Sequence, residues 1–598
     1  MAETDKRTPT VPGRPIRPLG LWLLSVVVGV VSGLGAGAFR ALIAFFHNVF
    51  FLGQISFSYD ANAHTPASPW GAWVILVPVV GAVGVVFLIK TFAPEAKGHG
   101  VPEVMDAVYY NKGIIRPVVA LIKSLASALC IGSGGSVGRE GPIIQIASSF
   151  GSTMGQWLRV PAWQRVTLIA AGAGGGIAAT FNTPIGGVLF AAEIMLHEVS
   201  VWTLVPVAIS TATATYVGRL LFGANASFVI PAFQQAYYHP TNPIVLLSYF
   251  GLAVLVGAAA ALFIKAIYVF EDLSEKVPGN DYIRHTLGML IVGLMMYALM
   301  LSQGHYYIEG IGYSTVQDIL AGTLAAILPL ALLFGLKLVA TSLTLGSGGS
   351  GGIFSPSLYL GATLGAAYGG VLGILFPGLP ISAPAFAVAG MAGMVGGATG
   401  AAITAIVMIF EMTRDYGVIV PMTITVAISY GVRKVLLRES IYTLKLARRG
   451  HYMPEALQTN FHHMKLARDL KAKTVLTIPN KTTLGELAKV LPQHESPTCW
   501  LVTDGDELKG VLTEEMAYRA LAGYDPSTPL SDLASDQYVM ISQNTTLFEI
   551  ITRMHNSRAE VFLVVPGAPS NAASNVEGWI SKERIAKSMA DGIGLFSD

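Results

Sequence analysis

The sequence predicts an all-α polytopic membrane protein, built as an inverted repeat with broken helices and followed by a small α/β module. Three observations predict this class. The 598 residues are 53% apolar and only 12% charged, whereas soluble domains carry about 25% charged residues. Long apolar stretches recur along the chain. The chain is also rich in glycine, with 65 residues of this type. Membrane proteins use glycine for close helix contacts and irregular backbone. These observations exclude a soluble enzyme of this size.

The membrane region follows a short polar segment. Residues 1–17 carry Lys and Arg and show no signal-peptide pattern, so we expect this segment to stay in the cytoplasm. Residues 18–445 form the predicted membrane region. Its apolar stretches approach the ~20 residues that span hydrocarbon, among them Leu21–Phe46, Trp70–Phe92, Val201–Phe222, Ile244–Ile267 and Thr286–Leu301. Basic residues from Arg433 to Arg449 follow the last stretch and place this end in the cytoplasm too.

The loops divide the membrane region into two halves of opposite orientation. Residues 223–242 contain no Lys or Arg and are expected outside, whereas the loop near Lys276 and Arg284 is expected inside. Each half, 18–222 and 244–440, therefore crosses the membrane an odd number of times. Two copies of one such unit lie upside down relative to each other.

A duplication supports this arrangement. Lys123, followed by GSGGS at 132–136, recurs at a constant spacing as Lys337, followed by GSGGS at 346–350. Farther along, a Gly-rich stretch that ends at Glu193 aligns with one that ends at Glu411. An inverted-repeat transporter or channel is therefore the predicted architecture.

After an expected linker at 446–471, the polar remainder has its own repeat. TTLGELAKVL begins at Thr482 and TTLFEIITRM at Thr545, and each is followed by two short strand patterns. This order of helix, strand, turn and strand predicts two small α/β modules. We place them at residues 472–525 and 530–598.

Three glycine turns are the candidate functional features. GHGVP (98–102), GREGP (138–142) and GIFSP (352–356) each combine Gly with a Pro in what would be the first turn of a helix. A helix start inside the membrane presents free N–H groups and the positive end of the helix dipole, so it attracts an anion without a buried Lys or Arg. Two inverted copies aim two such starts at one place.

These three motifs, in this order and between apolar segments, resemble the signature motifs of the CLC chloride channel and transporter family. The resemblance covers nearly the whole chain, and the C-terminal part resembles a tandem CBS pair. It implies a homodimer with one anion pore per subunit, which moves chloride or similar small anions. The expected location is a cell membrane, of the bacterial inner-membrane kind, with lipid as surroundings, both termini in the cytoplasm and no nucleic-acid partner.

The resemblance also assigns roles to residues. Glu140 would be a gating carboxylate that competes with the permeant anion for the N–H donors of GREGP. The alternative is a first-turn Glu that only complements the helix dipole, but a carboxylate within a membrane segment favours function. Arg139 beside it is also consistent with a structural pair. The anion-binding residues implied are His99, Gly138, Arg139, Gly141, Ile353, Phe354 and Tyr442.

Two positions depart from the family pattern. His99 stands where the family usually has Ser. A pore-facing imidazole would donate to the anion and make binding depend on pH, whereas a neutral imidazole turned away would not. Ile194 stands where proton-coupled members have an internal Glu that accepts protons. A passive channel is therefore the first expectation and a proton-coupled exchanger the alternative, with His197, Glu198 or a water chain as another proton route. A solute symporter ranks behind both.

Cofactors are not expected. Two cysteines support no metal or disulfide framework, and neither GSGGS continues into the G-K-[ST] of a phosphate-binding loop. Many tandem CBS pairs hold ribose with an acidic residue, and by this resemblance the matching positions carry Met516 and Arg584. Nucleotide binding is therefore doubtful, and an enzyme is not predicted.

Overall fold

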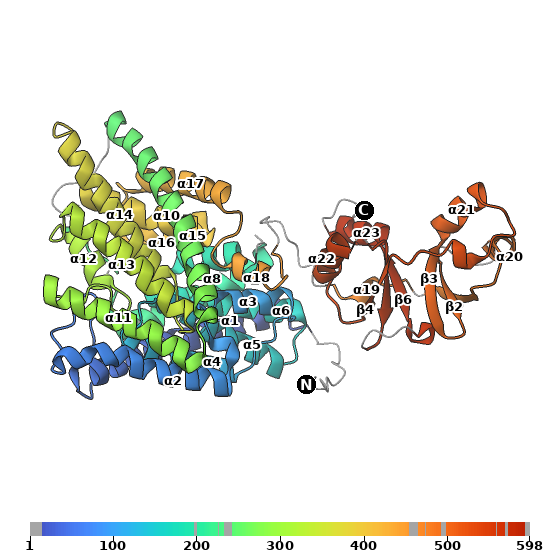
Figure 1. The fold of residues 1–598 in the computed structure, drawn as a ribbon, viewed down its shortest axis with the longest axis horizontal. Helices are drawn as coiled ribbons and strands as arrows, with labels where there is room; N and C mark the ends of the chain where they lie inside the picture. Colours follow the sequence, from blue (N-terminus) through green and yellow to red (C-terminus); the bar gives the residue numbers. More distant parts are fainter. Residues whose placement is uncertain are drawn as a thin grey trace. The chain divides into compact units, whose positions relative to one another are not determined.

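The computed structural model describes residues 15–196, 200–224, 227–231, 242–453, 465–472, 474–491, 498–557, 559–567 and 572–592. The chain divides into two compact units, Met1–Leu457 and Gln458–Asp598, coloured blue to orange and orange to red in Figure 1. The division falls within the expected linker 446–471. Residues 1–14 of the expected N-terminal segment, and His197 and Glu198, lie outside the described residues.

The first unit is helical. Its first half contains α1 (Pro18–His47), α2 (Val77–Phe92), α3 (Val101–Tyr109), α4 (Val118–Gly132), α5 (Glu140–Trp157), α6 (Ala162–Phe181), α7 (Pro184–Phe190) and α8 (Val201–Phe222). Its second half contains α10 (Pro243–Lys276), α11 (Asp281–Gln303), α12 (Tyr313–Ala321), α13 (Ile327–Gly346), α14 (Phe354–Leu375), α15 (Ala383–Thr399), α16 (Ala402–Thr413) and α17 (Ile419–Leu436). A short helix, α18 (Thr443–Ala447), follows.

The two halves repeat the same packing. Helix α1 packs on α6 and α8 as α10 packs on α15 and α17, and α5 packs on α6 as α14 packs on α15. The short α3 contacts α5 as α12 contacts α14, while α2 meets α11 and α7 meets α16 across the halves. The duplication read from the sequence is therefore a duplication of helix order and of contacts.

Eight helical segments of the described residues are long and apolar enough to cross a membrane: Pro18–Leu52, Gly71–Phe92, Val201–Phe222, Pro243–Lys276, Asp281–Gln303, Ile327–Gly346, Phe354–Leu375 and Ile419–Leu436. Four apolar helical segments are shorter: Val118–Gly132, Pro184–Leu196, Ala383–Thr399 and Ala402–Thr413. The polytopic helical prediction is confirmed.

Glycine permits the tightest helix contacts. A Cβ added at Gly361 of α14 would lie 2.3 Å from the Gly390 carbonyl oxygen of α15, and one at Gly390 would lie 2.3 Å from the Gly361 carbonyl oxygen. The backbones of α14 and α15 are so close at these two residues that no side chain fits between them. Small residues at helix crossings are how membrane helices gain dispersion contacts where lipid supplies no hydrophobic drive.

The second unit contains two three-stranded sheets of the same topology. In one, β1 (Val475–Pro479) pairs parallel with β2 (Cys499–Asp504), which pairs antiparallel with β3 (Glu507–Thr513). In the other, β4 (Tyr538–Ser542) pairs parallel with β5 (Val561–Val565), which pairs antiparallel with β6 (Gly578–Ser581). Their helices are α19 (Ala467–Leu470), α20 (Leu484–Val490), α21 (Glu514–Gly523), α22 (Leu547–Ser557) and α23 (Lys582–Gly592).

The predicted repeat of helix, two strands and turn is present in this unit, and each copy has an additional first strand. Buried apolar residues from the strands and the helices form its cores. Thr483 caps α20 by accepting from the Glu486 N–H, while the Glu486 side chain accepts from the Thr483 N–H. This reciprocal pair is the capping box that T-x-x-E predicts.

Candidate functional site

The three glycine turns of the sequence meet in space. Gly138 and Gly352 exchange backbone hydrogen bonds, N–H to carbonyl oxygen, at 2.7 and 2.6 Å. Gly98 donates to the Gly349 carbonyl at 2.9 Å and accepts from Gly351. Gly138 and Gly352 pair antiparallel, and they are equivalent residues of the two halves. An antiparallel pair of equivalent residues is the arrangement that a two-fold axis between the copies produces.

Two glycines of GREGP are required by the space around them. A Cβ at Gly141 would lie 2.1 Å from the His99 carbonyl oxygen and 3.1 Å from the Gly352 Cα. A Cβ at Gly138 would lie 2.4 Å from the Glu140 Oε2 atom. A side chain at Gly141 would force the backbones of His99 and Gly352 away, whereas one at Gly138 would displace the side chains of Glu140 and Ser355.

Glu140 occupies the first position of α5 and is buried, with 1% of its surface exposed. Its Oε1 atom accepts from the hydroxyl of Tyr313 at 2.6 Å and from the hydroxyl of Ser355 at 2.5 Å. The N–H of Ser355, in the first turn of α14, lies 3.4 Å from Oε2. The carboxylate of one helix start is therefore held by donors at the starts of two others, α12 and α14.

The amides of Ile353 and Phe354 remain available at the start of α14. The first N–H groups of a helix have no acceptor within it, and within the described residues no protein acceptor takes these two. The prediction for Gly138 is wrong as regards its own N–H, because that group is bonded to Gly352. Gly138 serves the site by leaving room for the carboxylate.

Arg139 lies against the gate region without a close partner. Its Nε atom is 4.0 Å from the Glu140 Oε1 atom and has no hydrogen-bond partner, and its guanidinium lies 5.3 Å from the Tyr313 ring centre. Arg139 thus forms a long ion pair with Glu140, in agreement with the structural pair expected from the sequence. At this distance Arg139 contributes positive potential rather than a fixed bond.

His99 and Tyr442 are neighbours on the other side of the GREGP turn. Their ring centres are 6.2 Å apart. His99 is 4% exposed and its Nδ1 atom has no hydrogen-bond partner. Burial, reinforced by Lys445, lowers the pKa of His99 to about 3. Of the two alternatives that the sequence left open, this burial favours the neutral imidazole, because burial disfavours the cation.

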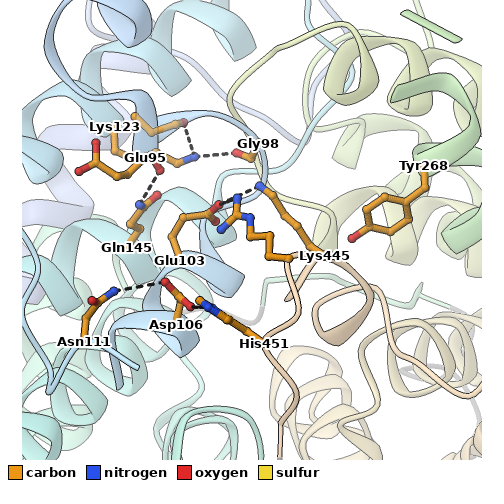
Figure 2. A network of polar contacts seen from close by, with 12 residues as sticks. Glu95, Gly98, Glu103, Asp106, Asn111, Lys123, Gln145, Tyr268, Lys445 and His451 are labelled. Carbon is orange, nitrogen blue, oxygen red and sulfur yellow. Dashed lines mark hydrogen bonds and ion pairs between the residues drawn. The ribbon is translucent and has the colours of Figure 1, made fainter. Parts of the chain in front are cut away.

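A cavity of about 460 Å³ opens next to His99. Its charged lining consists of four cations and four carboxylates: Lys97, Arg116, Lys445, Arg449, Glu95, Glu103, Asp106 and Glu271. Figure 2 shows the network in this region, with Lys445 at Glu103 and His451 at Asp106. The cavity is wide enough for water and small ions to reach the protein interior at this point.

Glu103 is the buried carboxylate of this network. Lys445 Nζ lies 2.8 Å and Arg449 Nη2 3.1 Å from its Oε1 atom. Burial alone would raise the pKa of Glu103, but attraction by Lys445 and then Arg449 outweighs burial and lowers it to about 2. Glu103 thus stays ionised and ties α3 to α18, the helix that follows Tyr442.

Glu193 and Glu411 accept hydrogen bonds at helix starts, which is a structural role. Glu193 accepts from the N–H of Thr404 at 2.8 Å at the start of α16, and Glu411 accepts from the N–H of Gly186 at 2.7 Å at the start of α7. Each carboxylate thus completes the helix start of the other half. Ile194 next to Glu193 is buried and offers no proton acceptor.

Sequence reasoning missed Tyr313, Ser355 and the roles of two buried lysines. Lys123 donates to the carbonyls of Ala96 and Gly98, and Lys337 donates to those of Ile308 and Gly310. The matched bonds show that GIGY at 310–313 is the partner of GHGV at 98–101. The shared Gly-x-Gly spacing was a signal in the sequence that could have located Tyr313.

The chain was compared with known proteins. It matches the family described as voltage gated chloride channel over residues 79–434. It is 31% identical, over 444 residues, to the H(+)/Cl(-) exchange transporter ClcA of Vibrio parahaemolyticus, which covers 72% of this chain and 90% of the relative.

Solved structures agree with this match at the level of the fold. The structure of a slow cyanobacterial Cl-/H+ antiporter matches with a TM-score of 0.62 and 24% identity, over 73% of this chain and 99% of that one. A eukaryotic CLC transporter matches with a TM-score of 0.57 and 19% identity, over 95% of this chain and 98% of that one.

The duplicated apolar helices and the meeting of two helix starts around a carboxylate define a multi-pass membrane protein of the inverted-repeat type. The family match covers more than half of the chain, and the ClcA match covers most of the relative. The chain belongs to the CLC family. It is accordingly an anion-transport protein and not an enzyme.

Proposed function

We propose that the protein exchanges chloride for protons. The observation that carries this proposal is the match to an exchange transporter, which covers 72% of this chain. The passive channel that the sequence favoured has less support. The exchanger was the alternative, and it is the better supported function.

The site geometry supports a mechanism of competition. The carboxylate of Glu140 and a chloride ion need the same donors, because both are anions without hydrogens of their own. When Glu140 is ionised it takes these donors and blocks the position. When a proton neutralises it, the acid binds them less tightly and chloride replaces it. One carboxylate thereby links proton binding to chloride movement, which is the requirement of an exchanger.

Protons then need a route to Glu140 that avoids Ile194. The cavity is lined by His99, whose ring centre is 6.2 Å from that of Tyr442. A water chain through this cavity is the proposed route. A passive channel is the second candidate, and the buried Ile194 at the position of the internal acceptor is the observation that favours it.

We place both termini in the cytoplasm of a bacterial cell and propose a homodimer, with one pore per subunit and chloride as the main ion. The C-terminal unit is proposed to be a tandem CBS pair that supports the dimer. Its two matching sheets support that proposal. Arg584 donates through Nε to the Leu470 carbonyl, so it is already engaged and a nucleotide role is not proposed.

Reconstituted liposomes test the proposal. A chloride gradient is applied without a proton gradient, and the pH of the external medium is recorded. Exchange predicts that protons move into the liposomes as chloride leaves, in a fixed ratio, and that a proton ionophore collapses the pH difference. Chloride release without any proton movement would contradict exchange and establish the passive channel.

A further inference from the structure

The Oε1 atom of Glu140 and the hydroxyl oxygens of Tyr313 and Ser355 lie within hydrogen-bond distance of one another. The Tyr313 hydroxyl lies 2.6 Å from Oε1 of Glu140 and 2.8 Å from the Ser355 hydroxyl, which itself lies 2.5 Å from Oε1. All three side chains are buried. They come from α12, α5 and α14, so the cluster exists only in the folded protein.

Counting hydrogens shows what this cluster does. An ionised carboxylate brings no hydrogen, so the three contacts share the two hydroxyl hydrogens. Hydrogen bonds to a charged acceptor are roughly twice as strong as neutral ones, so both hydrogens go to the carboxylate. Tyr313 and Ser355 therefore point two donors at one buried negative charge. A chloride ion in the same place would meet the same two donors.

We propose that Tyr313 and Ser355 form an anion-binding hydroxyl pair that holds the Glu140 carboxylate in one state and the transported anion in the next. The proposal rests on the proposed function, because it makes Glu140 and chloride alternative occupants of one position. It adds two ligands from side chains to a site whose other donors are backbone amides. Tyr313 contacts the ion, whereas Lys337 only positions Tyr313.

The backbone before α12 is built to fix Tyr313. Gly312, which precedes it, has a φ of +79°, and a Cβ there would lie 2.8 Å from the Tyr359 ring. The buried Lys337 ammonium binds the carbonyls of Ile308 at 3.0 Å and Gly310 at 2.9 Å. A loop held in this way delivers its phenol to one place, and preorganised donors lose little entropy when an anion arrives.

The charges around the pair favour an anion. The Arg139 guanidinium lies over the Tyr313 ring, and its Nε atom is 4.0 Å from the Glu140 carboxylate. Arg40 interacts electrostatically with Arg139 and Tyr313. Asp60 also interacts with Arg40, and Arg139 is the cation nearest the carboxylate, so an anion that replaces the carboxylate meets the positive charge of Arg139.

Calorimetry on purified full-length protein tests the pair. Glu140→Gln serves as the parent, because it removes the competing charge, and chloride is the probe. Tyr313→Phe in this parent should weaken chloride binding about tenfold or more, the loss expected for one hydrogen bond to a charged acceptor. Ser355→Ala should weaken it similarly and provides an independent second variant. Tyr359→Phe, a buried tyrosine on α14 that does not contact Glu140, is the matched control and should stay within twofold.

The pH profile of chloride flux gives a second readout. With Glu140 intact, Tyr313→Phe removes a donor that only the ionised carboxylate uses fully. The protonated form is then favoured, and the pH of half-maximal flux should rise by about one unit for a tenfold loss. A role in folding alone would lower the yield or the thermal midpoint and leave this pH unchanged.

The outcomes separate the two proposals. If Tyr313→Phe and Ser355→Ala bind chloride as tightly as the Glu140→Gln parent, the hydroxyl pair is refuted, whatever the proton measurements show. If both weaken binding while the unmodified protein moves no protons, the pair stands as part of a passive pore and the proposed exchange fails.

Discussion

Replacing Glu140 by Gln is the perturbation that the geometry describes most fully. In the native protein the ionised carboxylate accepts two hydroxyl donors, one from Tyr313 and one from Ser355. Hydrogen bonds to a charged group contribute about 1.5–3 kcal/mol each and neutral ones about 0.5–1.5 kcal/mol. The amide oxygen of Gln keeps the contacts but loses the charge, so the closed state should lose about 2–3 kcal/mol. This corresponds to a shift of roughly 30–150-fold toward the open position.

Chloride efflux from liposomes measures this shift. Glu140→Gln should pass chloride faster than the native protein at pH 7 and should lose most of its dependence on pH between 5 and 8. The native protein should approach the variant at the acidic end of this range. Glu275→Gln is the control, because it removes an exposed carboxylate that does not line the cavity. Equal efflux from native protein and Glu140→Gln across this whole range would remove Glu140 from the gating role.

Three further predictions follow from the site. Gly141→Ala places a Cβ 2.1 Å from the His99 carbonyl oxygen; we expect a lower thermal midpoint and loss of chloride binding, and full binding by this variant would show that the close approach is not needed. Glu103→Gln leaves Lys445 unpaired. Because the pKa of Glu103 is lowered to about 2, the stabilisation of the native protein by this ion pair is present above about pH 4.5 and is lost as pH falls through about 2. The difference in thermal midpoint between native protein and variant should be large at pH 7 and shrink on acidification, and a difference that does not change with pH would refute the ion pair. His99→Ser in the Glu140→Gln background should change anion affinity. It should not change how that affinity depends on pH between 5.5 and 7.5, because the pKa of His99 is lowered to about 3. A pH dependence that disappears on substitution would show instead that the imidazole titrates in this range.

The helix starts of the site could be predicted because their signals are local. Gly and Pro in GREGP and GIFSP mark the first turns of α5 and α14, and the repeated GSGGS indicated that the two belong together. Glu140 stood out because a carboxylate is rare within apolar sequence. These inferences need only the order of residues along the chain.

The contacts of Glu140 could not be predicted in the same way. The Gly-x-Gly spacing before Tyr313 and the GIFSP motif around Ser355 mark these positions in the sequence, but neither shows that their hydroxyls meet the Glu140 carboxylate, which depends on how the two halves pack. The N–H of Gly138 was expected to be free because a helix start leaves such groups unpaired. It instead donates to the Gly352 carbonyl oxygen, an arrangement that depends on how the two halves pack together.

The charge state of His99 could not be predicted from the sequence for a different reason. A histidine in a glycine turn titrates near neutral pH only while water reaches it. Whether water does so depends on burial, and here burial and the nearby Lys445 keep the imidazole neutral. The change from an expected channel to a proposed exchanger arose differently, from the comparison with relatives. Ile194 removes one proton acceptor and does not exclude another route.

The reversal potential of the purified protein in a planar bilayer tests the central claim most directly. With equal chloride on both sides and a pH difference across the membrane, an exchanger that moves n chloride ions per proton should shift the reversal potential by about 59/(n + 1) mV per pH unit. Glu140→Gln should show no such shift, because it cannot carry the proton. A native protein whose reversal potential follows chloride alone and ignores the pH difference would contradict proton-coupled exchange.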